Sequence, residues 1–233
     1  MKAICIIPAR GGSKGVPKKN IKKINGKPLL AYVIESTLKS KIFDHVIVST
    51  EDDEIAKIAK KFGAEVPFKR PKSLATDYAP MDKVLLHAVK TLYQLKYEFD
   101  VFVWRDATTP FIKSNDIRKS IQLLKKNNAS IVTGVYRQHL NPYFNIVEKK
   151  SNGFLKLCKP LKKKARSRQE APPVLQLNGL YVYDAKKFLK LKKTDLSKTL
   201  PCEIPVETGL MIDTEFEFEI AKILIQQKKI KLD

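Results

Sequence analysis

Residues 8–20 combine glycines and basic side chains in a spacing that suits a phosphate-binding loop. The apolar run 3–7 comes directly before them and predicts a buried strand. Glycines let a loop bring its backbone N–H groups close to a ligand, and cations beside them can bind phosphate oxygens. The loop contains Gly11, Gly12 and Gly15 together with Arg10, Lys14, Lys18 and Lys19. We therefore expect a triphosphate to bind here; the alternative is a surface loop that is basic because the chain is rich in Lys.

The order of these residues excludes two common phosphate-binding motifs. A Walker loop requires Gly-x-x-x-x-Gly-Lys followed by Ser or Thr, whereas Ser13 and Lys14 precede Gly15. The dinucleotide fingerprint Gly-x-Gly-x-x-Gly is absent as well. Residues 8–20 instead match every fixed position of Pro-Ala-Arg-x-Gly-Ser-Lys-Gly-x-x-x-Lys-Asn. This string resembles the first motif of the acylneuraminate cytidylyltransferases, or CMP-sialic acid synthetases, whose relatives act on legionaminate and pseudaminate.

That resemblance implies an enzyme that couples CTP to a nine-carbon 2-keto-3-deoxy sugar acid and releases pyrophosphate. It implies nucleotide binding by Ala9, Arg10, Gly12, Ser13, Lys14 and Asn20. Arg10, Lys19 and Mg²⁺ would then stabilise the charge that passes to the leaving group. A nucleotidyltransferase of the same fold acting on 3-deoxy-octulosonate or another sugar stays open. So do a non-catalytic nucleotide-binding homologue and, from another class, a nucleic-acid-binding protein.

Residues 48–52 and 70–77 resemble the second and third blocks of the same family. In relatives the arginine of the Arg-Pro pair lies over the nucleotide base, so Arg70 is the candidate for reading cytosine. A guanidinium can donate two parallel hydrogen bonds to the O2 and N3 acceptors of that base. The alternative for Arg70 is a surface arginine between a helix and a loop.

Residues 105–110 resemble the fourth block and follow a predicted strand at 101–104. Asp106 in this block could bind Mg²⁺, hydrogen-bond the sugar or the ribose, or cap the following turn. The last block, residues 211–215, reads Asp-Ile-Asp-Thr in relatives, with both acids near a divalent metal. Met211 takes the place of the first acid, so the resemblance leaves Asp213 as a catalytic residue and metal ligand, with Asp106 as the nearest acid that could compensate. A helix N-cap is the alternative role for Asp213.

Three parts of the chain resemble the family's sugar-contact region: residues 141–145, residues 166–173 and the Asn-Gly pair at 178–179. An acidic sugar needs a cation for its carboxylate, and Arg168 with Gln169 is the first choice for that role. The candidate substrate-binding residues are Asn141, Arg166, Arg168, Gln169 and Asn178.

Apolar segments with strand and helix patterns alternate along the chain. Strands are predicted at 3–7, 46–50, 101–104 and 131–132, and helices lie between them and at the C-terminal end. Such alternation indicates an α/β fold with a Rossmann-like, mainly parallel sheet covered by helices on both faces. Ligands in these sheets bind beyond the carboxyl ends of the strands, which is where the loop at 8–20 would lie.

The chain has 233 residues and 43% hydrophobic content, which suits one nucleotidyltransferase domain, 1–233. Residues ~135–175 break the alternation, and nine cations but no acid occur between 149 and 168. We interpret this part as an excursion for dimerisation and sugar contact. Relatives exchange this region across a two-fold axis, so the resemblance implies a homodimer.

Charge, cysteines and hydropathy restrict the partners and the compartment. The formal net charge is +21, but Lys is spread over helix surfaces and no nucleic-acid-binding motif accompanies it, so we do not expect a nucleic-acid partner. No stretch approaches the ~20 apolar residues of a membrane span, and we expect no membrane insertion. Three separated cysteines without a Cys-x-x-Cys motif favour a reducing cytoplasm.

Overall fold

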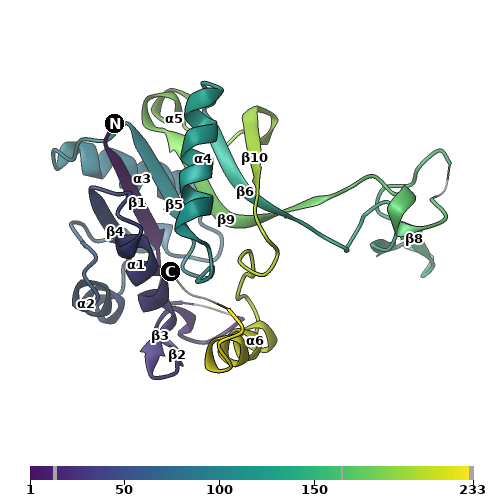
Figure 1. Ribbon diagram of the computed structural model, residues 1–233, viewed down its shortest axis with the longest axis horizontal. Helices are drawn as coiled ribbons and strands as arrows, with labels where there is room; N and C mark the ends of the chain where they lie inside the picture. Colours follow the sequence, from purple (N-terminus) through teal and green to yellow (C-terminus); the bar gives the residue numbers. More distant parts are fainter. Residues whose placement is uncertain (13–14, 164, 231–233) are drawn as a thin grey trace.

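A six-stranded, mainly parallel sheet forms the centre of the computed structural model, which describes residues 1–12, 15–163 and 165–230 (Figure 1). Its strands are β1 (Ala3–Pro8), β4 (His45–Ser49), β5 (Val101–Arg105), β6 (Ile131–Arg137), β9 (Leu175–Asp184) and β10 (Thr199–Glu203). They lie in the order β10-β6-β9-β5-β1-β4. Only β9 runs antiparallel to its neighbours among these strands. The predicted α/β class with a mainly parallel sheet is confirmed.

Helices cover both faces of this sheet because its strands are apolar on both sides. On one face lie α1 (Leu29–Lys39), α2 (Asp53–Lys61) and α4 (Ser114–Lys126); on the other lie α3 (Met81–Gln94) and α5 (Ala185–Leu191). Strand β1 shows the division, since Cys5 and Ile7 pack with the first group and Ile4 and Ile6 with the second. Helix α6 (Glu215–Gln226) packs through Phe218 on a third apolar cluster beside the start of α1.

Short elements complete the architecture. Two small hairpins are formed by β2 (Lys23–Ile24) with β3 (Lys27–Pro28) and by β7 (Val147–Lys149) with β8 (Leu155–Leu157). The 3₁₀ helices are η1 (Lys19–Ile21), η2 (Lys72–Leu74), η3 (Arg168–Glu170) and η4 (Leu196–Lys198). None of the helices within the described ranges is both long enough and apolar enough to cross a bilayer.

Residues 138–174 leave the sheet between β6 and β9 and form an arm that projects away from the body (Figure 1). The arm contains the β7–β8 hairpin, where Phe154 and Leu155 are 72% and 65% exposed. This is the segment for which the sequence predicts an excursion, and its role in dimerisation stays a prediction. Residues 175–203 return to the body as β9, α5 and β10.

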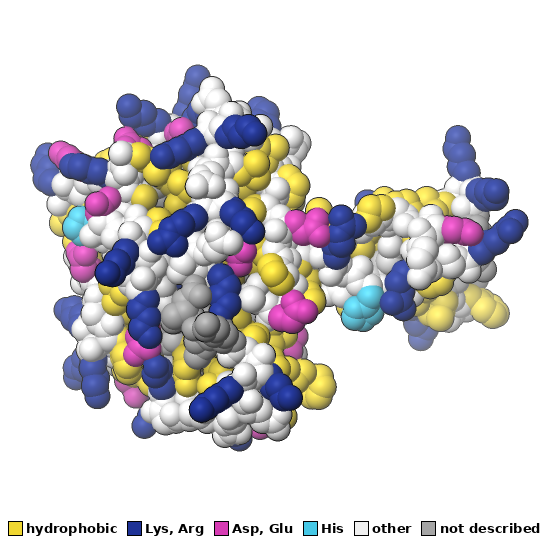
Figure 2. All heavy atoms as spheres, viewed as in Figure 1, with side chains coloured by type: hydrophobic (Ala, Val, Ile, Leu, Met, Phe, Trp, Pro, Cys, Tyr) yellow, Lys and Arg dark blue, Asp and Glu magenta, His cyan; other side chains and the backbone are white. Residues whose placement is uncertain are grey.

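The cationic side chains do not gather in one place on the face seen in Figure 2. Lys and Arg lie over the body and the arm with Asp and Glu between them. Ion pairs on the surface include Lys2–Glu98, Lys69–Asp53 and Arg137–Glu203. A dispersed pattern of this kind is typical of a solvated surface.

Candidate active site

A pocket of about 380 Å³ opens beyond the carboxyl ends of β1 and β5. Four separate parts of the chain meet there: the loop after β1, the segment between α2 and η2 that contains Arg70, the turn after β5 and the segment that precedes α6. The described residues that line it are Pro8, Arg10, Gly15, Lys19, Asn20, Arg70, Asp106, Ala107, Thr108, Met211 and Asp213. The fold therefore brings together the candidate residues of the first, third, fourth and last motifs.

The backbone of the loop after β1 is held by side chains from the loop itself and from other segments. Asn20 donates from Nδ2 to the carbonyl oxygen of Arg10 at 2.9 Å, and the Gly11 N–H donates to Glu51 Oε1 at 2.8 Å. A Cβ on Gly15 would lie 2.1 Å from the carbonyl oxygen of Asp213, so a side chain cannot be placed there without moving the backbone. Ala9 is buried, and its N–H donates to the Ser49 carbonyl oxygen.

Two of the loop's candidate residues, Ser13 and Lys14, lie outside the described residues. Gly12 is exposed, and an added Cβ would meet nothing within 4 Å. The structure thus gives a packing reason for glycine at 15 but none at 12.

Lys19 and Asp213 form a contact between the loop after β1 and the segment that precedes α6. Lys19 Nζ lies 2.7 Å from Asp213 Oδ1 and donates to the Ile212 carbonyl oxygen at the same distance. The Lys19 side chain is 11% exposed and that of Asp213 is 56% exposed. The N-cap of α6 is Thr214, which forms a capping box with Glu217, so capping does not account for Asp213.

Asp106 lies in the turn directly after β5 and is packed against β9. Its Oδ1 accepts a hydrogen bond from the Trp104 indole at 3.0 Å, and its backbone N–H donates to the Gly179 carbonyl oxygen. Gly179 has φ of +76°, and a Cβ there would lie 2.6 Å from Asp106 Oδ2. Burial raises the pKa of Asp106 to about 6; the Trp104 indole lowers it, the nearby Asp213 carboxylate raises it further and Lys19 opposes that rise. Asp106 and Asp213 are therefore close enough to interact.

Arg70 is a buried pocket residue and not the surface arginine of the alternative interpretation. It is 4% exposed, its Nε donates to Ser49 Oγ at 3.1 Å and its Nη2 donates to the Ser49 carbonyl oxygen. Burial lowers the pKa of Arg70 to about 10, and the Glu51 carboxylate opposes that shift. These contacts fix the guanidinium, and its Nη1 has no partner among the described residues, so that group can donate to a ligand.

The donor set of the pocket fits a magnesium ion. Mg²⁺ is usually held by one or two carboxylates together with substrate phosphates and water, and Asp106 and Asp213 both face the pocket. Met211 also lines it, but a thioether is a poor ligand for a hard cation. Among the described residues no group of three His, Cys, Asp or Glu side chains could hold a metal ion by itself. The two carboxylates therefore suit an ion that a bound triphosphate helps to hold.

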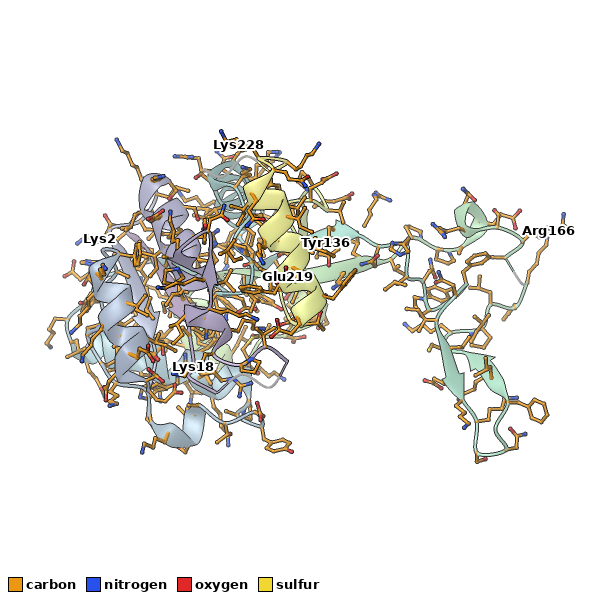
Figure 3. All side chains as sticks on the ribbon, turned by 90° about the horizontal axis from the view of Figure 1, so that it is seen from below. Lys2, Lys18, Tyr136, Arg166, Glu219 and Lys228 are labelled. Atoms are coloured by element: carbon orange, nitrogen blue, oxygen red, sulfur yellow. The ribbon has the colours of Figure 1, made fainter. Side chains whose placement is uncertain are left out.

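The candidate sugar-contact residues are divided between the arm and the sheet. Arg166, Arg168 and Gln169 are exposed on the arm, and Figure 3 shows Arg166 at its far end, away from the pocket of the same chain. Asn141 is buried in the arm, where its Oδ1 accepts from the Tyr143 N–H and its Nδ2 donates to the Pro172 carbonyl oxygen. Asn178 lies in β9 next to Gly179, which contacts Asp106; it is fully buried and its Nδ2 has no described partner.

The structure adds three residues to the site for which the sequence gives no role: Glu51, Asp77 and Trp104. Glu51 binds the loop backbone, Trp104 binds Asp106, and Asp77 Oδ1 lies 2.6 Å from Arg10 Nη2. Glu51 and Asp77 fall inside strings that resemble family blocks, and this position in the sequence is the only signal that could have drawn attention to them.

Comparisons with known proteins agree with this geometry. The family model described as "Cytidylyltransferase" matches residues 4–229. The chain is 36% identical over 231 residues to post-translational flagellin modification protein B of Campylobacter coli, covering 98% of this chain and 97% of the relative. It is also 36% identical over 229 residues to CMP-N,N'-diacetyllegionaminic acid synthase of Campylobacter jejuni, covering 97% and 96%.

A solved structure shares the fold at low sequence identity. It is that of CMP:2-keto-3-deoxy-manno-octonic acid synthetase complexed with CTP, with a TM-score of 0.71 and 19% identity. The similarity covers 98% of this chain and 100% of the other.

Proposed function

Because this chain belongs to the cytidylyltransferase family, we propose that it joins CTP to a nine-carbon 2-keto-3-deoxy sugar acid of the legionaminic, pseudaminic or sialic type. The products are the CMP-sugar and pyrophosphate. One observation supports this most directly: Arg10, Lys19, Arg70 and two carboxylates line a single pocket at the carboxyl edge of the sheet. Its cations suit a triphosphate, and its acids suit a divalent cation bound with that triphosphate.

The reaction requires little covalent chemistry from the protein. The anomeric hydroxyl of the sugar attacks the α-phosphorus in line, the bond from that phosphorus to the β-phosphate oxygen breaks, and pyrophosphate leaves. Negative charge builds on the leaving group, and Arg10 and Lys19 stabilise it from fixed positions. Lys19 is held at 2.7 Å by both Asp213 and the Ile212 carbonyl oxygen, so its ammonium group is placed before the substrate arrives.

Asp106 and Asp213 are the residues that would hold Mg²⁺. When bound, the ion neutralises phosphate charge that the two basic side chains do not reach. At neutral pH, above its raised pKa of about 6, the Asp106 carboxyl is mostly ionised and can serve as a ligand.

The arm supports a homodimer as part of this proposal. Its exposed Phe154 and Leu155 have no apolar core to enter in their own chain, and Arg166 lies at the far end of the arm, away from the pocket of its own chain (Figure 3). A second copy would cover the apolar residues and receive the cations near its sugar acid. All three cysteines are free, which suits the reducing cytoplasm that we propose as its location.

A pyrophosphate-release assay with a panel of substrates tests the function. CTP, UTP, ATP and GTP are each combined with legionaminic, pseudaminic and N-acetylneuraminic acids and with 3-deoxy-octulosonate. We expect release with CTP and one of the nine-carbon acids. Release with 3-deoxy-octulosonate alone would move the enzyme to the eight-carbon substrate, and no release with any pair would overturn the proposal.

A further inference from the structure

Asp77 determines where the Arg10 side chain points in this structure. The Asp77 Oδ1 and Arg10 Nη2 atoms are 2.6 Å apart, and the two side chains are 30% and 32% exposed. Among the described residues, the pocket lining includes Arg10 and Arg70 but not Asp77. The acid therefore holds Arg10 from outside the pocket.

The backbone of Arg10 is already fixed by other contacts. The peptide that joins Arg10 to Gly11 is held at its carbonyl oxygen by Asn20 Nδ2 and at its N–H by Glu51 Oε1. The remaining freedom of Arg10 lies in its side-chain torsions. The ion pair with Asp77 restricts these torsions.

The contact with Asp77 occupies one end of the guanidinium group and leaves donors for another ligand. Arginine has five N–H donors in a planar group, so Nη2 can bind Asp77 while Nε and Nη1 bind phosphate oxygens. We propose that Asp77 is a positioning residue, which aims Arg10 at the triphosphate. This inference rests on the proposed function, since a triphosphate is the ligand assigned to Arg10.

Asp77 also connects the candidate phosphate-binding residue, Arg10, with the segment that contains the candidate base-binding residue, Arg70. Asp77 follows Arg70 in the chain by seven residues, and Arg70 is fixed to the end of β4 through Ser49 and through the Thr50 carbonyl oxygen. Arg10, which would bind phosphate, is therefore oriented by the same segment that contains Arg70, which would bind the base. A base that displaces this segment would also move Arg10 away from the phosphates.

The expected size of the effect follows from the exposure of the pair. A partly exposed ion pair contributes about 0–1 kcal/mol to stability, so Asp77→Asn should fold normally. Misaligning one transition-state cation should lower kcat by about 10-fold. CTP affinity should change by less than about 3-fold, because lost alignment is offset by removal of a negative charge near the phosphates.

Two double-mutant cycles test the proposal with wild type, Asp77→Asn, Arg10→Ala and the double variant. In the kinetic cycle, Asp77→Asn should lower kcat in the wild-type background and leave it unchanged in the Arg10→Ala background. Asp77→Glu should restore at least half of the lost kcat. Glu98→Gln, which breaks the Lys2–Glu98 pair beyond the opposite edge of the sheet, is the matched control and should change nothing.

The binding cycle measures CTP affinity by calorimetry and needs no turnover. Asp77→Asn should tighten CTP binding about 3-fold in the Arg10→Ala background, because a negative charge near the phosphates is removed and no alignment of Arg10 is lost with it, and by less in the wild type. Equal effects of Asp77→Asn in both backgrounds would overturn the inference. So would tighter CTP binding with unchanged kcat in the wild-type background, which would make Asp77 a competitor of the phosphates.

The two proposals fail in different ways. A wild type that binds CTP but turns over no sugar acid would overturn the proposed function alone, since the binding cycle would still decide the role of Asp77. A wild type with no affinity for CTP would overturn both.

Discussion

Lys19 and Asp213, 194 residues apart in the chain, form an ion pair of 2.7 Å in the lining of the pocket. The ammonium group also binds the Ile212 carbonyl oxygen, and the Ile212 N–H binds the Thr108 carbonyl oxygen in the turn after β5. Three motif-bearing segments are thereby connected through one lysine. A cation fixed in this way loses little entropy when the transition state forms.

Lys19→Ala should lower turnover by roughly 10²–10³, which is typical of losing one preformed charge stabiliser. The measurement is kcat by pyrophosphate release at saturating CTP. Lys18→Ala is the matched control, because Lys18 is 72% exposed and pairs only loosely with Glu54 at 3.4 Å. Near-normal activity of Lys19→Ala would mean that this lysine does not act on the triphosphate.

Asp213→Asn should nearly abolish turnover, and Met211→Asp should lower the magnesium concentration that gives half-maximal rate. Both follow from a site with one acid fewer than the family pattern, because a carboxylate is a far better Mg²⁺ ligand than a thioether. Chelation with EDTA should abolish the wild-type rate, and added Mg²⁺ should restore it. Should Asp213→Asn keep its rate in the folded fraction, the metal must be bound elsewhere.

Asp106→Asn should stabilise the free protein at pH 7.5 while it abolishes activity. The folded-state pKa of Asp106 is raised from the usual 3.8 to about 6, so the folded form binds more protons than the unfolded form between these values. Stability therefore falls as pH rises through this range, and the full penalty applies above about pH 6. We expect Asp106→Asn to raise the free energy of unfolding by about 1–2 kcal/mol at pH 7.5. This is less than the full pKa shift implies, because the carboxyl group faces a solvent-filled pocket.

Thermal unfolding at two pH values checks this prediction. The melting temperature of Asp106→Asn should exceed that of the wild type by a few degrees at pH 7.5 and by nothing at pH 4. If Asp106→Asn raised the melting temperature equally at both pH values, the buried charge of Asp106 would not be the cause of the stabilisation.

The site residues that could be predicted from the sequence lie in short continuous motifs, which can be recognised from their residue types and spacing. Arg10, Lys19 and Asp213 were recognisable in this way, and the carboxyl-edge rule placed them together. The contacts of Asp77 with Arg10 and of Glu51 with Gly11 could not be predicted, because they join segments 40 or more residues apart and no periodicity reports such a distance. Their positions depend on how the loops close over the sheet.

The fold shows the same limit at two strands. The second half of strand β9 is buried on both sides, as is typical of a parallel strand, although β9 is antiparallel to both of its neighbours. The apolar pattern of the strand therefore does not predict its direction. Strand β10 was missed because it contains Pro201 and polar residues. It pairs only with β6 among the described strands, and a proline is tolerated in an edge strand.

The wild type should be a dimer at micromolar concentration, and replacing both Phe154 and Leu155 by Asp should give a monomer. The reason is that these exposed apolar side chains can be covered only by another molecule. Light scattering measures the mass. Leu196→Asp is the matched control, because Leu196 is 59% exposed on the body and should leave the dimer intact. A wild-type monomer with full activity would reject the dimer.

Mixing two inactive variants should restore activity if the arm of one copy completes the pocket of the other. Lys19→Ala removes a pocket cation and Arg168→Ala removes an arm cation, so each homodimer lacks one group at both sites. In a mixed dimer, the Arg168→Ala subunit keeps an intact pocket and receives an intact arm. Random exchange of equal amounts makes half of the dimers mixed, and one site in each is complete, so about a quarter of wild-type activity should return. An Arg168 that served its own pocket would leave both sites of the mixed dimer defective, and the mixture would then stay as inactive as its components.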